Sequence, residues 1–147
     1  MSSCGLNDRR LSWRARLTGY KFLARCLVTV AATRIALCTL GYRRLRQPRP
    51  GSERLAPPHL VARVRAGVVW AARYVPGATC LTQAVACRRL LARHGFPTTL
   101  RIGVRPDPQK GFTAHAWLLS GDEIVVGGEE AELRSYSKLA DFEASSQ

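Results

Sequence analysis

The hydrophobic pattern of this chain changes its period once, at Pro97, and that change restricts the fold more than any other feature. Before Pro97, apolar residues recur every three or four positions, which predicts amphipathic helices. After it, apolar and polar residues alternate over 98–104, 112–119 and 123–127, which predicts three strands. Since helices come first and closely spaced strands follow, the sequence indicates an α+β domain with N-terminal helices and a small antiparallel sheet.

Three helices are expected ahead of the sheet. The first covers about 11–45, the second 59–74, and the third begins near Thr79 or Cys80 and stops at Gly95. Arg34 lies at the edge of the inward stripe of the first helix, so it must find a partner or extend to solvent. That expected stripe consists of Tyr20, Leu23, Leu27, Ala31, Ile35 and Cys38.

The 147 residues suit one compact domain. We expect a flexible tail over 1–10, a helical segment and linker over 11–58 that docks a partner or substrate, and a catalytic core over 59–147. The linker is indicated by the Pro-, Gly- and charge-rich run at 46–58.

The positive charge of the chain is concentrated in its first two-thirds. Residues 1–106 hold 20 basic and 2 acidic residues, a balance of +18, whereas residues 107–147 hold 3 basic and 8 acidic residues, a balance of −5. Such a field attracts an acidic polypeptide, an anionic membrane or nucleic acid. Nucleic acid is not expected, because basic and aromatic residues do not alternate as they do on base-stacking surfaces.

Five cysteines at irregular spacings favour reduced thiols in a cytoplasmic protein. The apolar run at 26–42 is shorter than the roughly 20 residues that a membrane span needs and contains Arg34, so a spanning helix is not expected. The Arg-rich segment 11–45 could instead lie on the inner membrane surface, or pack on the partner that brings the substrate.

The motif "PGATCLTQ" places Cys80 where a turn becomes a helix. Unpaired backbone N–H groups and the helix dipole favour a thiolate there. The Thr79 hydroxyl could cap the helix, and the Cys80 N–H, with Gln83 beside it, could hold an oxyanion. The alternative is that Cys80 is a small buried hydrophobe, as we expect of Cys87.

A metal site is a competing interpretation, because Cys80, Cys87 and His94 are seven residues apart along one helix. Neighbours in this set are separated by about 10.5 Å, too far for two thiolates that must each lie about 2.3 Å from one zinc. We therefore expect no metal and no cofactor.

A nucleophilic thiolate needs a general base, and His115 is the histidine placed to supply it. It lies in "FTAHAWLL", with Trp117 two positions on and so on the same face of the strand, where it could contact substrate. A helix that starts with Cys and packs against a strand that carries His is typical of papain-like and transglutaminase-like enzymes.

The stretches "CLTQAVACRRLLARHGFPTTLRIGV" and "FTAHAWLLSGDEIVVGG" resemble the standalone leader peptidases of lasso-peptide biosynthesis, and "TRIALCTLGYRRL" is also similar. These bacterial enzymes are transglutaminase-like cysteine proteases. The resemblance implies a papain/transglutaminase-like core, Cys80 as nucleophile and His115 as base. It implies removal of the leader from a precursor peptide, delivered by a separate recognition-element protein, before an ATP-dependent cyclase closes a macrolactam. The alternative is a non-catalytic basic binding module.

The third catalytic residue is not evident. A three-residue turn places His115 opposite Gly127 and a two-residue turn places it opposite Gly128, so no side chain stands where an acid is expected. We expect Glu129, on the same face as Gly127, to reach back diagonally as the third catalytic residue; the alternatives are Asp122 in the turn, which is more distant, and a backbone carbonyl or water that orients the imidazole.

Overall fold

Three helices precede a four-stranded sheet in the computed structural model, which describes residues 5–41, 54–128 and 135–142, with side chains from residue 18 onward. The helices are α1 (Gly5–Leu40), α2 (Pro58–Ala72) and α3 (Cys80–Arg93). The strands are β1 (Thr99–Asp107), β2 (Gly111–Ser120), β3 (Glu123–Val126) and β4 (Ser137–Phe142). The predicted α+β class, with helices first and an antiparallel sheet after them, is confirmed.

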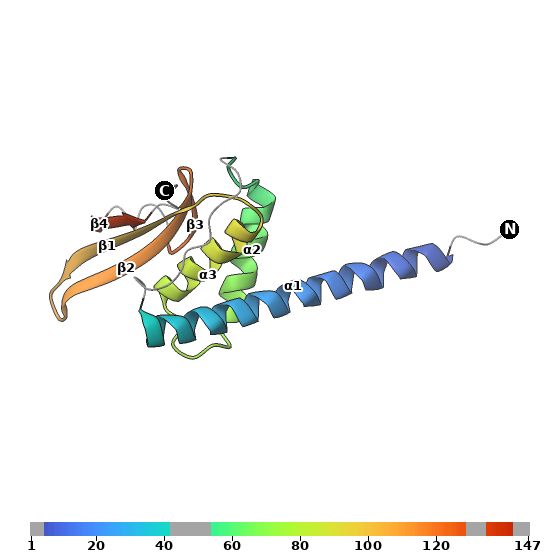
Figure 1. Ribbon diagram of the computed structural model, residues 1–147, viewed down its shortest axis with the longest axis horizontal. Coiled ribbons are helices and arrows are strands. Elements are labelled where there is room, and N and C mark those ends of the chain that lie inside the picture. The colour runs from blue at the N-terminus through green and yellow to red at the C-terminus, as the bar shows by residue number, and fades with distance from the viewer. Residues whose placement is uncertain (1–4, 42–53, 129–134, 143–147) are drawn as a thin grey trace.

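The helices are stacked against the sheet. α3 contacts β1, β2 and β3, α2 contacts α3 and β3, and α1 packs across both α2 and α3 (Figure 1). The N-terminal part of α1 projects well beyond the other elements (Figure 1). The start of α3 is thereby held beside the sheet, and the outward side of α1 is left uncovered.

The sheet has the order β3-β2-β1-β4, with every neighbouring pair antiparallel. β4 is a strand that the sequence pattern did not predict. Three of its six residues, Ser137, Lys138 and Leu139, are exposed, so it lacks the alternation that marks a half-buried strand. Its pairing with β1 is reinforced by a two-pronged ion pair from Arg101 to Asp141, with N–O distances of 2.7 and 3.0 Å.

Helix α1 differs from its predicted bounds at both ends. It begins at Gly5, so residues 5–10 continue the helix instead of forming a tail. It ends at Leu40 rather than near residue 45, because Gly41 adopts a φ of +69°, the left-handed conformation that commonly terminates helices. Residues 1–4 lie outside the described part of the chain.

The predicted inward stripe of α1 is only partly correct, because Leu27 packs against the main core but half of the predicted residues are exposed. Tyr20 and Ile35 are 70% and 64% exposed, whereas Cys26, Val30 and Thr33 are completely buried. Gly67 of α2 lets α1 approach closely: a Cβ at Gly67 would lie 2.6 Å from the Cys26 Sγ. The absence of a side chain at Gly67 thus leaves room for the side of α1 that carries Cys26.

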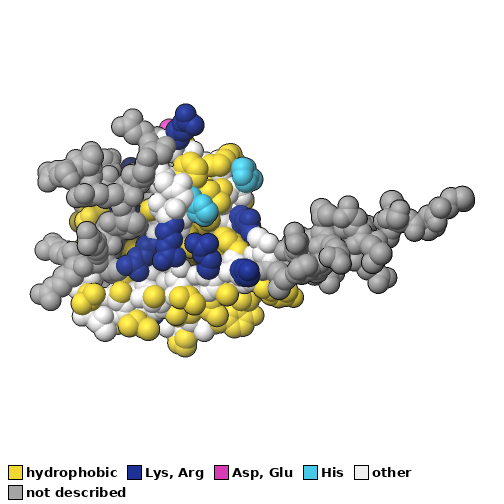
Figure 2. Space-filling model, turned by 45° about the vertical axis from the view of Figure 1, so that its right-hand side comes forward, with side chains coloured by type: hydrophobic (Ala, Val, Ile, Leu, Met, Phe, Trp, Pro, Cys, Tyr) yellow, Lys and Arg dark blue, Asp and Glu magenta, His cyan; other side chains and the backbone are white. Residues whose placement is uncertain are grey.

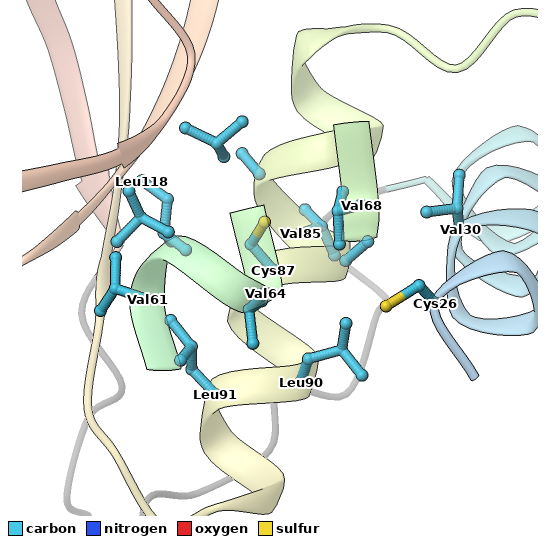
Figure 3. Close-up of a cluster of buried hydrophobic side chains, with 14 of the residues drawn as sticks. Cys26, Val30, Val61, Val64, Val68, Val85, Cys87, Leu90, Leu91 and Leu118 are labelled. Atoms are coloured by element: carbon cyan, nitrogen blue, oxygen red, sulfur yellow. The ribbon is translucent and has the colours of Figure 1, made fainter. Parts of the chain in front are cut away.

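The main core lies between the three helices and the inner face of the sheet (Figure 3). Val64 and Val68 of α2 face Val85 and Cys87 of α3, and Leu118 joins them from β2. All five side chains are fully buried. α3 is therefore fixed on three sides, which makes it a rigid support for the residue at its start.

Candidate active site

Cys80 is the first residue of α3, as the sequence predicts. α2 ends at Ala72, and Gly77, with φ +70°, provides the left-handed turn that leads the chain back into α3. The Cys80 side chain is half-buried, packs against the main core and forms no disulfide. It therefore combines a fixed backbone with partial access to solvent.

Thr79 is the N-cap residue of α3, but the capping hydrogen bond expected from its hydroxyl is not formed. The Thr79 Oγ1 lies 3.4 Å from the Thr82 Oγ1 instead. Gln83, one turn into the helix and half-buried, donates its backbone N–H to the Thr79 carbonyl at 3.0 Å. The Thr79 side chain thus leaves the first N–H groups of α3 available to an incoming acceptor.

Cys87 is a core residue, as expected. It is fully buried two turns along α3, and burial raises the pKa of its thiol. Burial likewise raises the pKa of the Cys26 thiol, against the opposing effect of Arg25 and Arg63. Neither the Cys26 thiol nor the Cys87 thiol is suited to form a thiolate.

His115 lies in the middle of β2, opposite Gly103 of β1. Its ring stacks with Trp117 at a centroid distance of 6.2 Å, so the prediction that the two share a face is confirmed. Tyr136, which the sequence did not single out, contacts both rings at 5.5 and 6.3 Å, and the Arg105 guanidinium lies 4.9 Å above it. Tyr136 is distant in sequence and only the pairing of β4 with β1 brings it here.

The His115 imidazole is oriented by a backbone carbonyl, one of the three alternatives left open by the sequence. Its Nε2 is hydrogen bonded to the Gly127 carbonyl oxygen. Because a carbonyl oxygen only accepts, Nε2 carries the proton, and Nδ1 is the nitrogen left to take up another. The carbonyl thus fixes the tautomer, as the acid of a catalytic triad does.

The register of the β2–β3 hairpin differs from both registers considered for the sequence. Ser120 pairs with Glu123 across a two-residue turn, but a bulge next to Leu118 shifts the following pair to Leu118 and Val126. Gly127 consequently lies beside Trp117 rather than opposite His115: a Cβ there would be 2.7 Å from the Trp117 Cα.

Of the other two candidates for the third residue, Glu129 lies outside the described residues. Asp122 is exposed in the turn between β2 and β3. Among the described residues, the groups around the imidazole are the Gly127 carbonyl and two aromatic rings.

Trp117 is only 5% exposed, because it forms a second, smaller core with Leu119, Ile124 and Tyr136. This placement leaves its ring little surface for contact with substrate. Trp117 instead forms the wall against which the imidazole stacks.

Cys80 and His115 occupy different sides of the sheet. Ala116 and Leu118 of β2 face the helices with Cys80, whereas the alternation of the strand turns His115 and Trp117 to the outer face. In the part of the chain with described side chains, no hydrogen bond joins the thiol to the imidazole. Their meeting would require a movement of the imidazole or of β2.

Within the described ranges, no group of three His, Cys, Asp or Glu side chains could hold a metal ion. The chemistry available at Cys80 and His115 is nucleophilic attack and proton transfer.

The comparisons with known proteins agree with this architecture. Residues 23–141 match the family model of the transglutaminase-like superfamily. No curated protein and no solved structure gives a significant match to the chain. The matched region covers most of the chain, so this protein belongs to the transglutaminase-like superfamily, and its three helices and four-stranded antiparallel sheet form a transglutaminase-like core. The match begins within α1, so the second half of that helix is part of the family domain.

Proposed function

We propose that this protein is a cysteine protease that removes the leader from a ribosomally made lasso-peptide precursor. The observation that carries the proposal is the position of Cys80: it opens α3, and α3 packs on the strand of His115 within a transglutaminase-like domain. The resemblance of the motifs around these two residues to lasso leader peptidases supports the choice of substrate.

The reaction is a hydrolysis in two steps. The Cys80 thiolate attacks the carbonyl carbon at the end of the leader, and the unprotected N–H groups at the start of α3 stabilise the oxyanion. Protonated His115 gives its Nδ1 proton to the departing amine as the C–N bond breaks. Water, deprotonated at the same nitrogen, then hydrolyses the thioester and releases the leader as a carboxylate. The freed core amine is the group that a macrolactam cyclase would use.

The proposal includes a conformational step, because the imidazole lies on the outer face of the sheet in the conformation described above. We propose that the precursor, held by a separate recognition-element protein, brings β2 and the start of α3 into the reactive arrangement. This movement must exchange a hydrogen bond to one carbonyl and two ring contacts, and, because a residue changes face only when its strand slips or rotates, the local pairing of β2 with β1 as well.

The decisive experiment measures cleavage of a precursor peptide encoded beside this chain, in the presence of the recognition-element protein, by mass spectrometry. Cys80→Ala and His115→Ala are each expected to abolish cleavage, and intact mass should reveal a leader thioester on Cys80. Cys38→Ser and His94→Ala are matched controls, because both residues are exposed and belong to neither proposed role. A Cys80→Ala protein that still releases the leader, or a wild-type protein that never does, would refute the proposal.

The separation of thiol and imidazole favours one alternative, a non-catalytic module that binds the leader through its basic surface. If the protein is such a module, the wild type and the variants Cys80→Ala and His115→Ala should bind the peptide with equal affinity. None of the three should cleave the peptide. The affinity of the module would fall steeply as the salt concentration rises.

A further inference from the structure

The outward side of α1 carries an apolar stripe next to a hollow lined by arginines. Tyr20, Val28 and Ile35 are 70%, 68% and 64% exposed. Ala24, Ala31 and Cys38 lie on the same side of the helix, since positions 20, 24, 28, 31, 35 and 38 follow its repeat of 3.6 residues. Figure 2 shows this apolar band along the lower edge of the molecule, beneath a row of basic side chains.

The hollow lies between α1 and α3 and has a volume of about 270 Å³. Arg25 lines it from α1, and Arg89 and Arg93 line it from α3. Its remaining lining is apolar or small and consists of Ala24, Val28, Thr29 and Ala32. Val28 belongs both to the hollow and to the exposed stripe, so the three guanidinium groups and the apolar band form one continuous surface.

No acidic residue balances this surface within α1, α2 or α3 from residue 9 onward, and the next acids after Glu53 begin at Asp107, at the end of β1. The charged side chains visible above the band in Figure 2 are accordingly almost all basic among the described residues. The helical layer is thus positive and partly apolar, whereas most acids of the chain belong to its last third.

We infer that this surface docks on an anionic phospholipid membrane. The guanidinium groups of Arg25, Arg89 and Arg93 would bind lipid phosphates, and Val28 and Ile35 would enter the acyl boundary below them. Large exposed apolar patches beside cations are typical of membrane-docking faces. The inference does not depend on the chemistry at Cys80.

The same helix is long and apolar enough to be considered as a membrane span, since an 18-residue window within Thr18–Leu40 has a mean hydropathy of 1.6. Its packing argues for a different orientation. Cys26, Val30 and Thr33 are fully buried, on a side of α1 that packs against α2 and α3. Lipid could not surround α1 without removing it from the core, so a position parallel to the membrane surface keeps the fold intact.

Flotation of the full chain with lipid vesicles tests this inference. We expect binding to phosphatidylcholine vesicles that contain about a quarter phosphatidylglycerol, little binding to pure phosphatidylcholine, and release as salt rises from about 0.1 to about 0.5 M. The double variant Arg25→Gln/Arg89→Gln should bind about tenfold to thirtyfold more weakly. Val28→Asp/Ile35→Asp should abolish binding even at low salt.

Matched controls separate this face from the general charge of the chain. Arg65→Gln removes a cation that lines a different hollow, between α2 and β3, and Leu139→Asp alters an exposed apolar residue of β4. Both controls should float like wild type, and circular dichroism should show that all variants are folded. Equal binding to neutral vesicles, no binding to either kind, or equal losses in the control variants would overturn the inference. It would also be overturned if the Val28/Ile35 variant lost leader cleavage without vesicles while its flotation was unchanged, since the face would then bind a polypeptide.

Discussion

The two faces of the sheet are built by different forces. The inner face is closed by the helices and contributes five buried apolar side chains to the main core, namely Leu100, Ala116, Leu118, Val125 and Val126. The outer face has only a small apolar core around Trp117 and Leu119, and it adds directional contacts: the hydrogen bond and ring contacts of His115, and the ion pair of Arg101 with Asp141. Changes on the inner face should therefore affect stability, whereas changes on the outer face should affect orientation and pH dependence.

The largest effect is expected for a cavity on the inner face. Leu118 is fully buried, so Leu118→Ala should lower the free energy of unfolding by about 2–5 kcal/mol. Leu139 is 66% exposed on β4, and Leu139→Ala should change it by less than about 0.5 kcal/mol. Urea denaturation followed by circular dichroism measures the free energy of unfolding of both variants. Similar losses in the two variants would contradict the expected difference between inner and exposed positions.

A smaller effect is expected when the support of the imidazole is disturbed. Gly127 has φ +118°, and a Cβ there would lie 2.7 Å from the Trp117 Cα. Gly127→Ala should therefore lower the free energy of unfolding by about 1–3 kcal/mol. It should also break the hydrogen bond between the Gly127 carbonyl and His115, which changes the ¹⁵N spectrum of the imidazole. Gly19→Ala, which meets no atom within 4 Å, should leave that spectrum unaltered. An unchanged His115 signal in Gly127→Ala would show that the carbonyl does not set the tautomer.

The ion pair of the outer face should give the sheet a pH-dependent stability. The hydrogen bond from Arg101 is the main reason that the pKa of Asp141 is lowered to about 2, with Lys138 adding to it. Since the unfolded carboxyl titrates near 4, the contribution is complete above that value and is lost as the pH falls toward 2.

The variant Asp141→Asn measures how much this ion pair stabilises the sheet. Because the pair is only partly exposed, the variant should lower the free energy of unfolding by about 1–2 kcal/mol at pH 7. The difference from wild type should vanish only once the pH falls below the folded-state pKa of about 2. Asp122→Asn, in the exposed turn, should change stability by less than about 0.5 kcal/mol. A difference between Asp141→Asn and wild type that persists unchanged to pH 2 would contradict the ion-pair account.

The smallest effect is expected for the rates at which two thiols on the inner side of the sheet are chemically modified. In a Cys4→Ser/Cys38→Ser background, iodoacetamide should modify Cys80 well before Cys87, because Cys87 is fully buried and burial raises its pKa. Peptide mapping over time measures the order. Modification of both thiols at the same rate in the folded protein would mean that α3 opens as a whole.

Local patterns in the sequence predicted much of this fold. The change of period at Pro97 located the boundary between helices and sheet, and the Pro76–Gly77 turn located the start of α3 at Cys80 to within one residue. Both signals work because they act over a few neighbouring residues, through helix periodicity and backbone conformation. Likewise, period 2 in a strand placed His115 and Trp117 on one face before any contact was known.

Contacts between distant segments were beyond such reasoning. β4 is defined by its pairing with β1, and Tyr136 reaches His115 only through that pairing. The inward side of α1 packs closely on Gly67 of α2, and its own apolar pattern indicated that side only in part. The bulge beside Leu118 moved Gly127 by one position, an insertion that residue counting from the turn does not reveal.

The sequence alone determined the order of helices and strands, the thiol at the start of α3 and the histidine in β2, because these follow from local periodicity and turn chemistry. Only the tertiary structure decided which side of the sheet each of them faces. That outcome depends on burial. The residues of β2 that the helices cover form the inner face, and because side chains alternate along a strand, the residues next to them lie on the outer face.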